Sequence, residues 1–455
     1  MKQKYDQLAR RRIDIDAAYR QGRLSYDRQM IGIGGASHLP VPESIRPHIG
    51  ALKHRMVRVF LQEYFFIYPE HGRFDWSRLD AFMDSVAELG VDVLASICIK
   101  PRVLYPKLDP AVYMPNDIDE WRMVIRELVK RYSVERRLVT HWAVANEINI
   151  GESGGCPHEI KDPDEYYEFY RLTSQAILEA WPEARVGGPS VAGFDYDYLA
   201  RFVKRCCADG APLDFISYNI YSGDPEQHAS AARHARELAD RRGADVEVYQ
   251  TELNTWFPDA YVEEVAYSGR YAASLAAVLM ELNETPITGS FQFDMYDEYV
   301  DPDDFEQFYT ITPFMLQHWN EVPHRFGLLD FDGRVRPQYF VYQMLRDVSG
   351  ERISAVAHDE PIRMAASIQP DGYAIIVNNF SQDAGGDCVA DLHMRGLERG
   401  LYRLEVYRVD DDAHWDAECM QLLPVESRLT YVLPEFNMHV LLPEDSVTFV
   451  RLTRQ

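Results

Sequence analysis

Short apolar runs alternate with amphipathic segments over residues 30–347 of the 455-residue chain. Several of these runs are almost continuously apolar, which is typical of parallel strands covered on both faces. The segments between them repeat apolar residues at helical spacing, as residues 79–89 and 121–132 do. We expect strands at Ile31–Gly34, Met56–Phe60, Asp92–Ile99, Val139–Asn146, Arg185–Gly188, Phe215–Asn219, Val246–Thr251 and Thr288–Phe293.

Eight strand–helix units in one uninterrupted run predict a closed barrel rather than an open doubly wound sheet. An open dinucleotide-binding sheet would also carry a GxGxxG turn after its first strand, and the Gly32–Gly35 run lacks that spacing. The fold class is therefore α/β, a (β/α)₈ TIM barrel that we place at residues 28–348.

The pattern changes to strands after about Gly350. Asp371-Gly372 is a strong hairpin signal, and further strands are expected at 373–377, 401–409 and 446–452. We predict an antiparallel β-sandwich domain over residues 349–455, joined by a strand from residues 10–27. Because no low-complexity linker separates the two domains, they should pack closely.

Charge and hydropathy exclude several classes of partner. The net charge of −25 disfavours nucleic acid and anionic membrane surfaces, because the field of the protein repels phosphate. Residues 1–16 are charged and lack the apolar core of a signal peptide, and no apolar run is long enough to span a bilayer. We expect a cytoplasmic protein that acts on a small substrate. The sequence is compatible with a homo-oligomer as well as with a monomer.

The six cysteines form no CxxC pair and show no zinc-ligand spacing. In a reducing compartment they are expected to be free thiols. A Cys388–Cys419 bridge is the alternative if the protein is exported.

Two of the predicted strands end in glutamate: the fourth at Asn146-Glu147 and the seventh at Thr251-Glu252. Active sites of such barrels lie at the C-terminal ends of the strands, so both carboxylates should face one cleft. Retaining glycoside hydrolysis uses such a pair, one as general acid/base and one as nucleophile. We assign Glu147 as acid/base and Glu252 as nucleophile. Asn146 is expected to bind the sugar 2-hydroxyl, and Tyr221 to orient Glu252.

These two motifs resemble those of clan A glycoside hydrolases. Within the clan the chain is most similar to family 39, the β-xylosidases and α-L-iduronidases. Shorter likenesses spread over Arg55–Leu345, at Phe74–Asp80, Val186–Pro189, Leu213–Ser217, Pro323–Leu329 and Pro337–Phe340. The resemblance implies a retaining enzyme that releases terminal sugars from short oligosaccharides, with xyloside-like substrates favoured.

The chain departs from the family pattern around the sugar. The family's Trp-Asn-Glu-Pro is Ala145-Asn-Glu-Ile148 here, and its Arg-x-His is Arg58-Val-Phe60. Its His-x-Tyr on the sixth strand is Asn219-Ile-Tyr221, and Phe291-Gln-Phe293 stands where an eighth-strand Trp is usual. These changes keep both glutamates and alter the wall of the pocket.

Several further residues are candidates for the site. Arg58 resembles a family arginine that supports the nucleophile. His38, Asn219 and Trp256 are expected to contact substrate, although core packing is the alternative for Trp256. Lys100 either binds a uronate carboxylate or, as we favour, is a surface lysine at a helix start.

The acidic stretch Asp294–Glu306 is interpreted as a solvated loop at the barrel mouth, with a cation site as the alternative. The chain shows no HExxH zinc motif and no nucleophile elbow. Since two-carboxylate chemistry needs neither metal nor cofactor, we expect none. An endo-acting clan A glycanase and a carbohydrate-binding barrel without hydrolytic activity are the alternative functions.

Overall fold

The computed structural model of the chain describes residues 7–257, 263–321, 325–359, 361–383, 385–412, 414–416 and 420–455. Cys419, and with it the alternative Cys388–Cys419 bridge, lies outside the described residues, as do the first two residues of the Pro323–Leu329 segment. The five described cysteines are free, as the sequence predicts. No described helix combines the length and the apolar character needed to cross a membrane.

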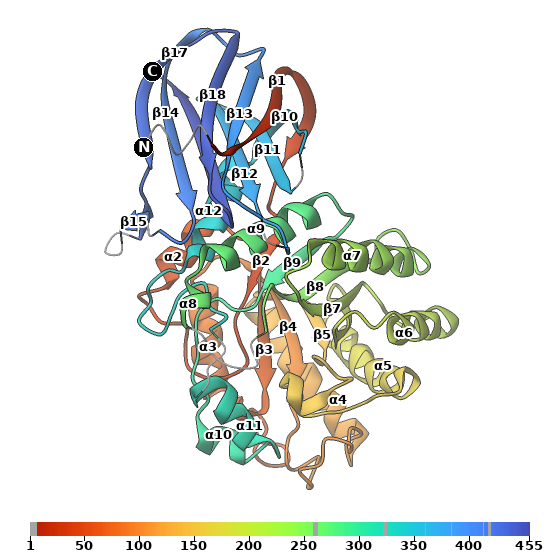
Figure 1. The fold of residues 1–455 in the computed structure, drawn as a ribbon. Coiled ribbons are helices and arrows are strands. Elements are labelled where there is room, and N and C mark those ends of the chain that lie inside the picture. The colour runs from red at the N-terminus through yellow and green to blue at the C-terminus, as the bar shows by residue number, and fades with distance from the viewer. Residues whose placement is uncertain are drawn as a thin grey trace.

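Eight parallel strands close into a barrel in chain order, which confirms the predicted fold. Figure 1 shows the barrel in the lower body of the molecule, with the helices around it. The strands are β2 (Gln29–Gly32), β3 (Met56–Gln62), β4 (Asp92–Cys98), β5 (Val139–Val144), β6 (Arg185–Ala192), β7 (Phe215–Tyr221), β8 (Glu247–Asn254) and β9 (Gly289–Gln292).

Helices follow the strands and cover the outside of the barrel. The longer ones are α2 (Arg46–Leu52), α3 (Ser77–Ala87), α4 (Ile118–Val129), α5 (Pro163–Ala180), α6 (Tyr196–Asp209), α7 (Pro225–Asp240), α9 (Gly269–Asn283) and α12 (Pro337–Val348). Short helical pieces lie in the loops: η1 (Glu63–Phe65), η2 (Lys130–Glu135), η3 (Gly151–Gly154), α8 (Glu263–Ala266), α10 (Pro302–Glu306), α11 (Thr312–Leu316) and η4 (Gln317–Glu321).

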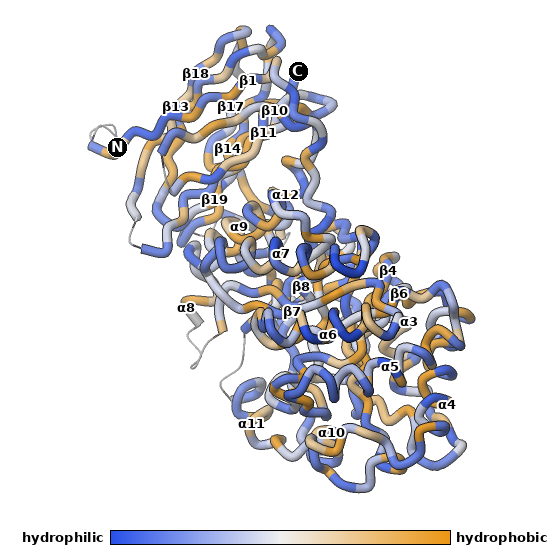
Figure 2. Tube along the Cα trace, turned by 90° about the vertical axis from the view of Figure 1, so that its right-hand side faces the viewer, coloured by the Kyte–Doolittle hydropathy of each residue, from blue (hydrophilic) through white to orange (hydrophobic). Residues whose placement is uncertain are grey.

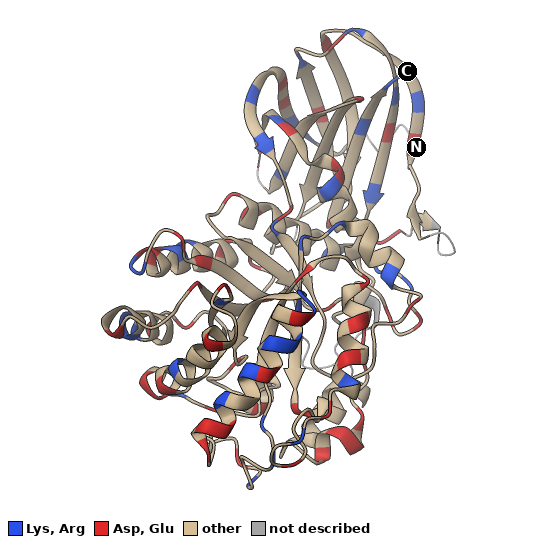
Figure 3. Cartoon of the chain, turned by 180° about the vertical axis from the view of Figure 1, so that it is seen from behind, with Lys and Arg blue, Asp and Glu red and all other residues tan. Residues whose placement is uncertain are grey.

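Four of the outer helices begin at an aspartate. The carboxylates of Asp117, Asp162, Asp195 and Asp224 accept backbone N–H groups in the first turns of α4, α5, α6 and α7. An acid also suits the positive end of the helix dipole. Figure 3 shows charged residues mainly on the outer helices and loops, so part of the acidic excess stabilises local structure.

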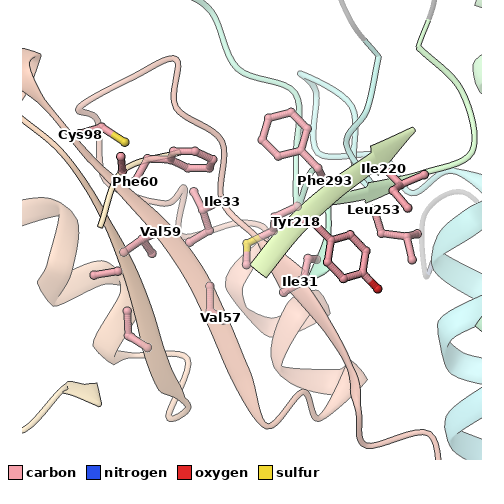
Figure 4. Packing of buried hydrophobic residues seen from close by; sticks show 14 of the residues in the cluster. Ile31, Ile33, Val57, Val59, Phe60, Cys98, Tyr218, Ile220, Leu253 and Phe293 are labelled. Carbon is pink, nitrogen blue, oxygen red and sulfur yellow. The ribbon is translucent and has the colours of Figure 1, made fainter. Parts of the chain in front are cut away.

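The barrel interior is filled with apolar side chains at its N-terminal end, whereas polar residues gather at its C-terminal end. Met30, Leu94, Phe215, Tyr249 and Phe291 form an apolar cluster inside the N-terminal half of the barrel. Figure 4 shows the Phe60 and Phe293 rings farther along the strands than Ile31 and Val57. Beyond these rings the strands end in polar residues, so the C-terminal end of the barrel is where a site can form.

The second domain is one curled sheet of nine strands, in the order β17-β14-β19-β12-β11-β10-β1-β13-β18. Strand β1 (Ala9–Leu24) pairs antiparallel with β10 and parallel with β13, and it lies in the region where the sequence predicts a joining strand, residues 10–27. The other strands are β10 (Gly350–Ala357), β11 (Ile362–Gln369), β12 (Gly372–Asn379), β13 (Cys388–Arg395), β14 (Gly400–Val409), β17 (Glu426–Val432), β18 (Glu435–Leu442) and β19 (Ser446–Arg454); β15 (Trp415–Asp416) and β16 (Gln421–Leu422) form a separate small ribbon.

The two halves of this sheet share one core, which confirms the predicted sandwich. The core contains Ile13 and Leu392 from one half and Ile375 and Leu404 from the other. Figure 2 shows hydrophilic and hydrophobic residues mixed along these strands, as expected when one face is buried. The sheet also packs on the barrel: Asn378 Nδ2 donates to the Ala273 carbonyl in α9 at 3.0 Å.

Candidate active site

Glu147 and Glu252 line one cavity of about 330 Å³ at the C-terminal end of the barrel. Glu252 is the sixth residue of β8, and Glu147 lies three residues beyond the end of β5. Both side chains are more than nine-tenths buried. The folded barrel therefore brings together the two carboxylates that the sequence places on non-adjacent strands.

Glu252 is held by two hydrogen-bond donors. Arg58 Nη1 donates to Glu252 Oε1 at 2.8 Å, and the Tyr221 hydroxyl donates to Glu252 Oε2 at 2.6 Å. The Arg58 side chain is fully buried on β3, so its charge is little screened and compensates the negative charge of the carboxylate. Each Glu252 oxygen is thus fixed by a different strand.

Glu147 is held without a cation of its own. Asn219 Nδ2 donates to Glu147 Oε1 at 3.0 Å, and burial raises the pKa of Glu147 well above its usual value, with the negative charge of Glu252 adding to the effect. Glu147 therefore holds a proton more strongly than an ordinary glutamate, as a general acid must. Gly154 lies directly against the carboxyl group, where any larger residue would clash with it.

The backbone around Glu147 adopts an unusual conformation. Ala145 has a φ of 73° and Glu147 a φ of 42°, both in the left-handed region that non-glycine residues rarely occupy. The Glu147 N–H is nevertheless anchored to the Ser190 carbonyl at 2.8 Å. Such local strain gathers at functional sites, because the surrounding fold has to hold it.

An amide network connects the two glutamates. Asn146 Oδ1 accepts from Arg58 Nη2 at 2.6 Å and from Asn219 Nδ2 at 3.1 Å. Asn219 Oδ1 in turn accepts from the Thr251 hydroxyl at 2.7 Å. Arg58, Asn146, Asn219 and Tyr221, all expected from the sequence, therefore contact the carboxylates or one another.

Two sequence-predicted contacts lie elsewhere. His38 Nδ1 pairs with Asp304 Oδ2 at 2.6 Å, and His38 does not line the cavity of the glutamates. Trp256 packs edge-on against Tyr271, with ring centroids 6.1 Å apart, and lines a second cavity between the barrel and the β domain. Its neighbour Phe257 lines the first cavity instead.

The expectation of a surface Lys100 is wrong. Lys100 is 5% exposed, and its Nζ donates to the Asp109 and Pro157 carbonyls at 2.7 and 2.9 Å. Burial lowers its pKa to about 8. Lys100 ties two loops together and does not line the cavity of the glutamates.

The acidic stretch is not a solvated loop throughout, which corrects the sequence interpretation. Asp294, Asp297, Glu298 and Asp304 are buried. Asp297 forms a two-pronged ion pair with Arg336, and Asp304 binds Arg78 at 2.7 Å. The sequence does not show the partners of Asp297 and Asp304, because distant segments of the chain contribute them.

Among the described residues, one group has the proximity needed for a metal ion: Asp410, Asp412 and His414 in the β domain. Asp410 already pairs with Arg408 at 2.5 Å and with His414 at 3.0 Å. Arg408 therefore already compensates the charge of Asp410.

The sequence indicates Phe60 and Phe293 in the pocket wall, but not the other aromatic residues of the cavity. Phe60, Phe257, Phe326, Trp319 and Gln62 line it beside the glutamates. Gln62 and Phe60 end the second strand, so their position gave a signal; the others come from loops whose direction the sequence does not show.

Known proteins resemble this chain in sequence and in fold. The chain is 25% identical over 312 residues to a β-xylosidase from Caldicellulosiruptor saccharolyticus, which covers 63% of this chain and 59% of that protein. The chain thus spans less than two thirds of the length of this curated relative.

Two solved structures share the fold over nearly the whole chain. A monomeric β-xylosidase from Caulobacter crescentus CB15 superposes with a TM-score of 0.77 at 19% identity, covering 98% of this chain and 99% of that one. A family 39 enzyme from Xanthomonas axonopodis pv. citri has a TM-score of 0.77 at 18% identity and covers 98% of both chains. The model of glycosyl hydrolases family 39 matches residues 43–381, about three quarters of the sequence, and the chain belongs to this family.

Proposed function

We propose that the protein is a retaining glycoside hydrolase, with Glu147 as general acid/base and Glu252 as nucleophile. The observation that carries the proposal is the asymmetry of the buried pair: Glu252 is bound by Arg58 and Tyr221, whereas Glu147 has the raised pKa of a proton donor. Pairs of carboxyl groups with environments this different support acid and nucleophile roles in glycosidases.

In the first step Glu252 attacks the anomeric carbon and the bond to the leaving oxygen breaks. The electron pair of that bond stays on the oxygen, which takes the proton of Glu147 and departs as a neutral alcohol. Glu252 is then joined to the sugar as an ester, and Glu147 is a carboxylate.

In the second step water replaces Glu252. Glu147 removes a proton from the water, the water oxygen bonds to the anomeric carbon, and Glu252 leaves with the electron pair of the ester bond. The sugar is released with its original configuration, and both side chains return to their starting states.

The amide network has a positioning role in this proposal. Asn146 receives Arg58 and Asn219 on its oxygen, and its Nδ2 donates to the Gly154 carbonyl at 3.0 Å. This fixes the amide at the level of the carboxylates, where it can meet the sugar 2-hydroxyl. Asn219 holds Glu147, and Arg58 holds Glu252, in a fixed position relative to the Asn146 amide.

We propose that the enzyme is exo-acting and removes single sugars from short glycosides. Xyloside-like substrates are the favoured class. A cavity of about 330 Å³ suits one sugar ring better than a polymer, and the curated relative described above is a β-xylosidase. An endo-acting glycanase would instead cut inside polysaccharides, and a binding barrel would not cut at all.

The test is a 2-fluoro sugar with a good leaving group, which traps the glycosyl–enzyme ester. The trapping sugar is chosen by a screen of nitrophenyl xyloside, galactoside, arabinoside and glucuronide. We expect mass spectrometry to place the adduct on Glu252, and Glu252→Ala and Glu147→Ala to lose several powers of ten in turnover. Glu70→Gln, an exposed acid outside the cavity, is the control. An adduct elsewhere, or near-normal turnover in either alanine variant, would contradict the assignment.

We also propose the domain division at residues 28–348 and 349–455, with residues 10–27 assigned to the second domain. The pairing of β1 with β10 and β13 supports this division. Cytoplasmic location and homo-oligomer formation stay predictions.

A further inference from the structure

The mouth of the cavity is rimmed by exposed apolar side chains. Ile150, Phe257 and Phe314 all border the cavity, and 40%, 51% and 39% of their surfaces are exposed. They come from three separate segments: the loop after β5, the segment after β8, and α11. Single exposed apolar residues are ordinary, whereas several gathered at the mouth of one pocket indicate an apolar ligand.

An aromatic wall continues from this rim to the glutamates. The Phe257 ring lies 5.2 Å from Tyr221 and 5.7 Å from Phe326, measured between ring centroids. Phe293 lies 5.6 Å from Phe326 and 6.2 Å from Phe60. A molecule that extends from Glu252 to the mouth therefore passes along ring faces and edges.

The polar side chains in the cavity are largely committed to the protein. Gln62 Nε2 donates to the Gly155 carbonyl at 2.6 Å, and Gln62 Oε1 accepts from the Tyr309 hydroxyl at 2.5 Å. Asn146 is engaged in the amide network. Of the described side chains that line the cavity, the Ser153 hydroxyl and the Trp319 indole N–H are the remaining polar groups besides the glutamates and Tyr221. A second sugar would leave hydroxyl groups without partners here, which is costly.

One residue of the rim, Ile150, lies in the loop that carries the general acid. Ile150 follows Glu147 in the same loop, and its N–H donates to the Glu147 carbonyl at 2.9 Å. Since the general acid protonates the leaving oxygen, the leaving group lies beside Glu147. We propose that the leaving group is a hydrophobic alcohol or phenol, so that the substrates are alkyl or aryl glycosides rather than oligosaccharides. This inference rests on the proposed hydrolase function.

The first test is a series of alkyl glycosides with methyl, butyl, hexyl and octyl chains, compared with the disaccharide of the same sugar. The sugar is the one turned over in the nitrophenyl screen. Because these simple alcohols are similar leaving groups, differences in kcat/KM report contacts with the chain. A fully buried methylene is worth about fourfold, so with partial burial we expect kcat/KM to rise about tenfold or more from methyl to octyl. The kcat/KM of the disaccharide should be lower than that of the octyl glycoside.

A flat series, or a disaccharide cleaved as fast as the octyl glycoside, would overturn the inference while leaving the hydrolase intact. Failure of the hydrolase proposal looks different: no nitrophenyl glycoside is cleaved and Glu252 takes no adduct. In that case the inference falls as well.

The second test separates the rim from surface hydrophobicity in general. Phe314→Ser should lower the octyl-to-methyl ratio of kcat/KM by about threefold or more, since a ring contact with the chain is lost. Phe66→Ser is the matched control, because Phe66 is 38% exposed and does not line the cavity. An unchanged ratio in both Phe314→Ser and Ile150→Ser would exclude the rim as the binding surface.

Discussion

Two pairs of buried carboxyl groups lie at the mouth of the barrel, and they differ in their partners. Glu147 and Glu252 share a network with Arg58, whose guanidinium contacts Glu252 directly. Asp294 and Glu298 lie against each other at Gly34, but the nearby arginine, Arg336, is taken by Asp297. Within the part of the chain that the structure describes, Asp294 Oδ2 and Glu298 Oε2 have no hydrogen-bond partner.

The difference decides which groups carry charge. Burial, with the charge of Glu298, raises the pKa of Asp294 well above its usual value, and burial raises the pKa of Glu298 to about 8. Each member of the second pair therefore holds its proton more strongly than an exposed carboxyl group does. In the first pair the arginine compensates one carboxylate, and the other keeps its proton beside an open cavity. Residue type alone does not make a catalytic pair; a cation on one side and access to substrate do.

Arg58→Met should have the largest effect, because it makes the first pair resemble the second. Removing one partner of a buried ion pair costs about 3–5 kcal/mol and leaves Glu252 an uncompensated charge that will take up a proton. We expect kcat/KM to fall by about 10²–10³-fold or more, because Glu252 loses the cation that compensates its charge and one of the two donors that orient it.

Arg336→Met is the matched control for that prediction. It breaks the buried ion pair with Asp297, so it should reduce stability in urea unfolding by a similar amount. Per folded molecule, its kcat/KM should change far less than that of Arg58→Met. Equal losses of kcat/KM in the two variants would mean that Arg58 acts only through folding.

Glu298→Gln should have an intermediate effect, on stability and its pH dependence. The pKa of Glu298 is about 8 in the folded protein, against about 4.3 for an unfolded glutamate. Between these values the folded state binds a proton that the unfolded state has released, so stability falls as pH rises from about 4.5 to about 8. Glutamine removes this titration.

Urea unfolding of the wild type and Glu298→Gln at pH 5 and pH 8 checks this prediction. The variant should lose less stability over that interval, with a difference on the order of 2–4 kcal/mol. The exposed Glu70→Gln serves as control and should follow the wild type. Parallel curves for wild type and Glu298→Gln would show that the second pair does not hold its proton.

Trp256→Ala should have the smallest effect. Trp256 faces the second cavity, so kcat/KM should change by less than about threefold, whereas Phe257→Ala removes a ring from the cavity wall and should cost about tenfold. The two residues are neighbours, which makes them a matched pair. A loss in Trp256→Ala as large as in Phe257→Ala would place the tryptophan on the substrate side after all.

The sequence by itself determined the barrel and the residues at the strand ends. Strand periodicity and burial are local properties, so β3, β5, β7 and β8 could be recognised from short apolar runs. A residue at the end of a barrel strand has few directions available. For this reason the sequence predicts that Glu147 and Glu252 face one cleft, whereas Arg58, which lies inside β3, enters the prediction through the family resemblance.

The tertiary structure decided everything carried by loops. Whether His38 meets a substrate or Asp304, and whether Lys100 is exposed or buried, depends on segments far away in the chain. The same holds for the acids of Asp294–Glu306, whose charge depends on which of them receives Arg336 or Arg78. Local patterns fix side-chain direction within a strand, but packing between distant segments sets partners, burial and therefore charge.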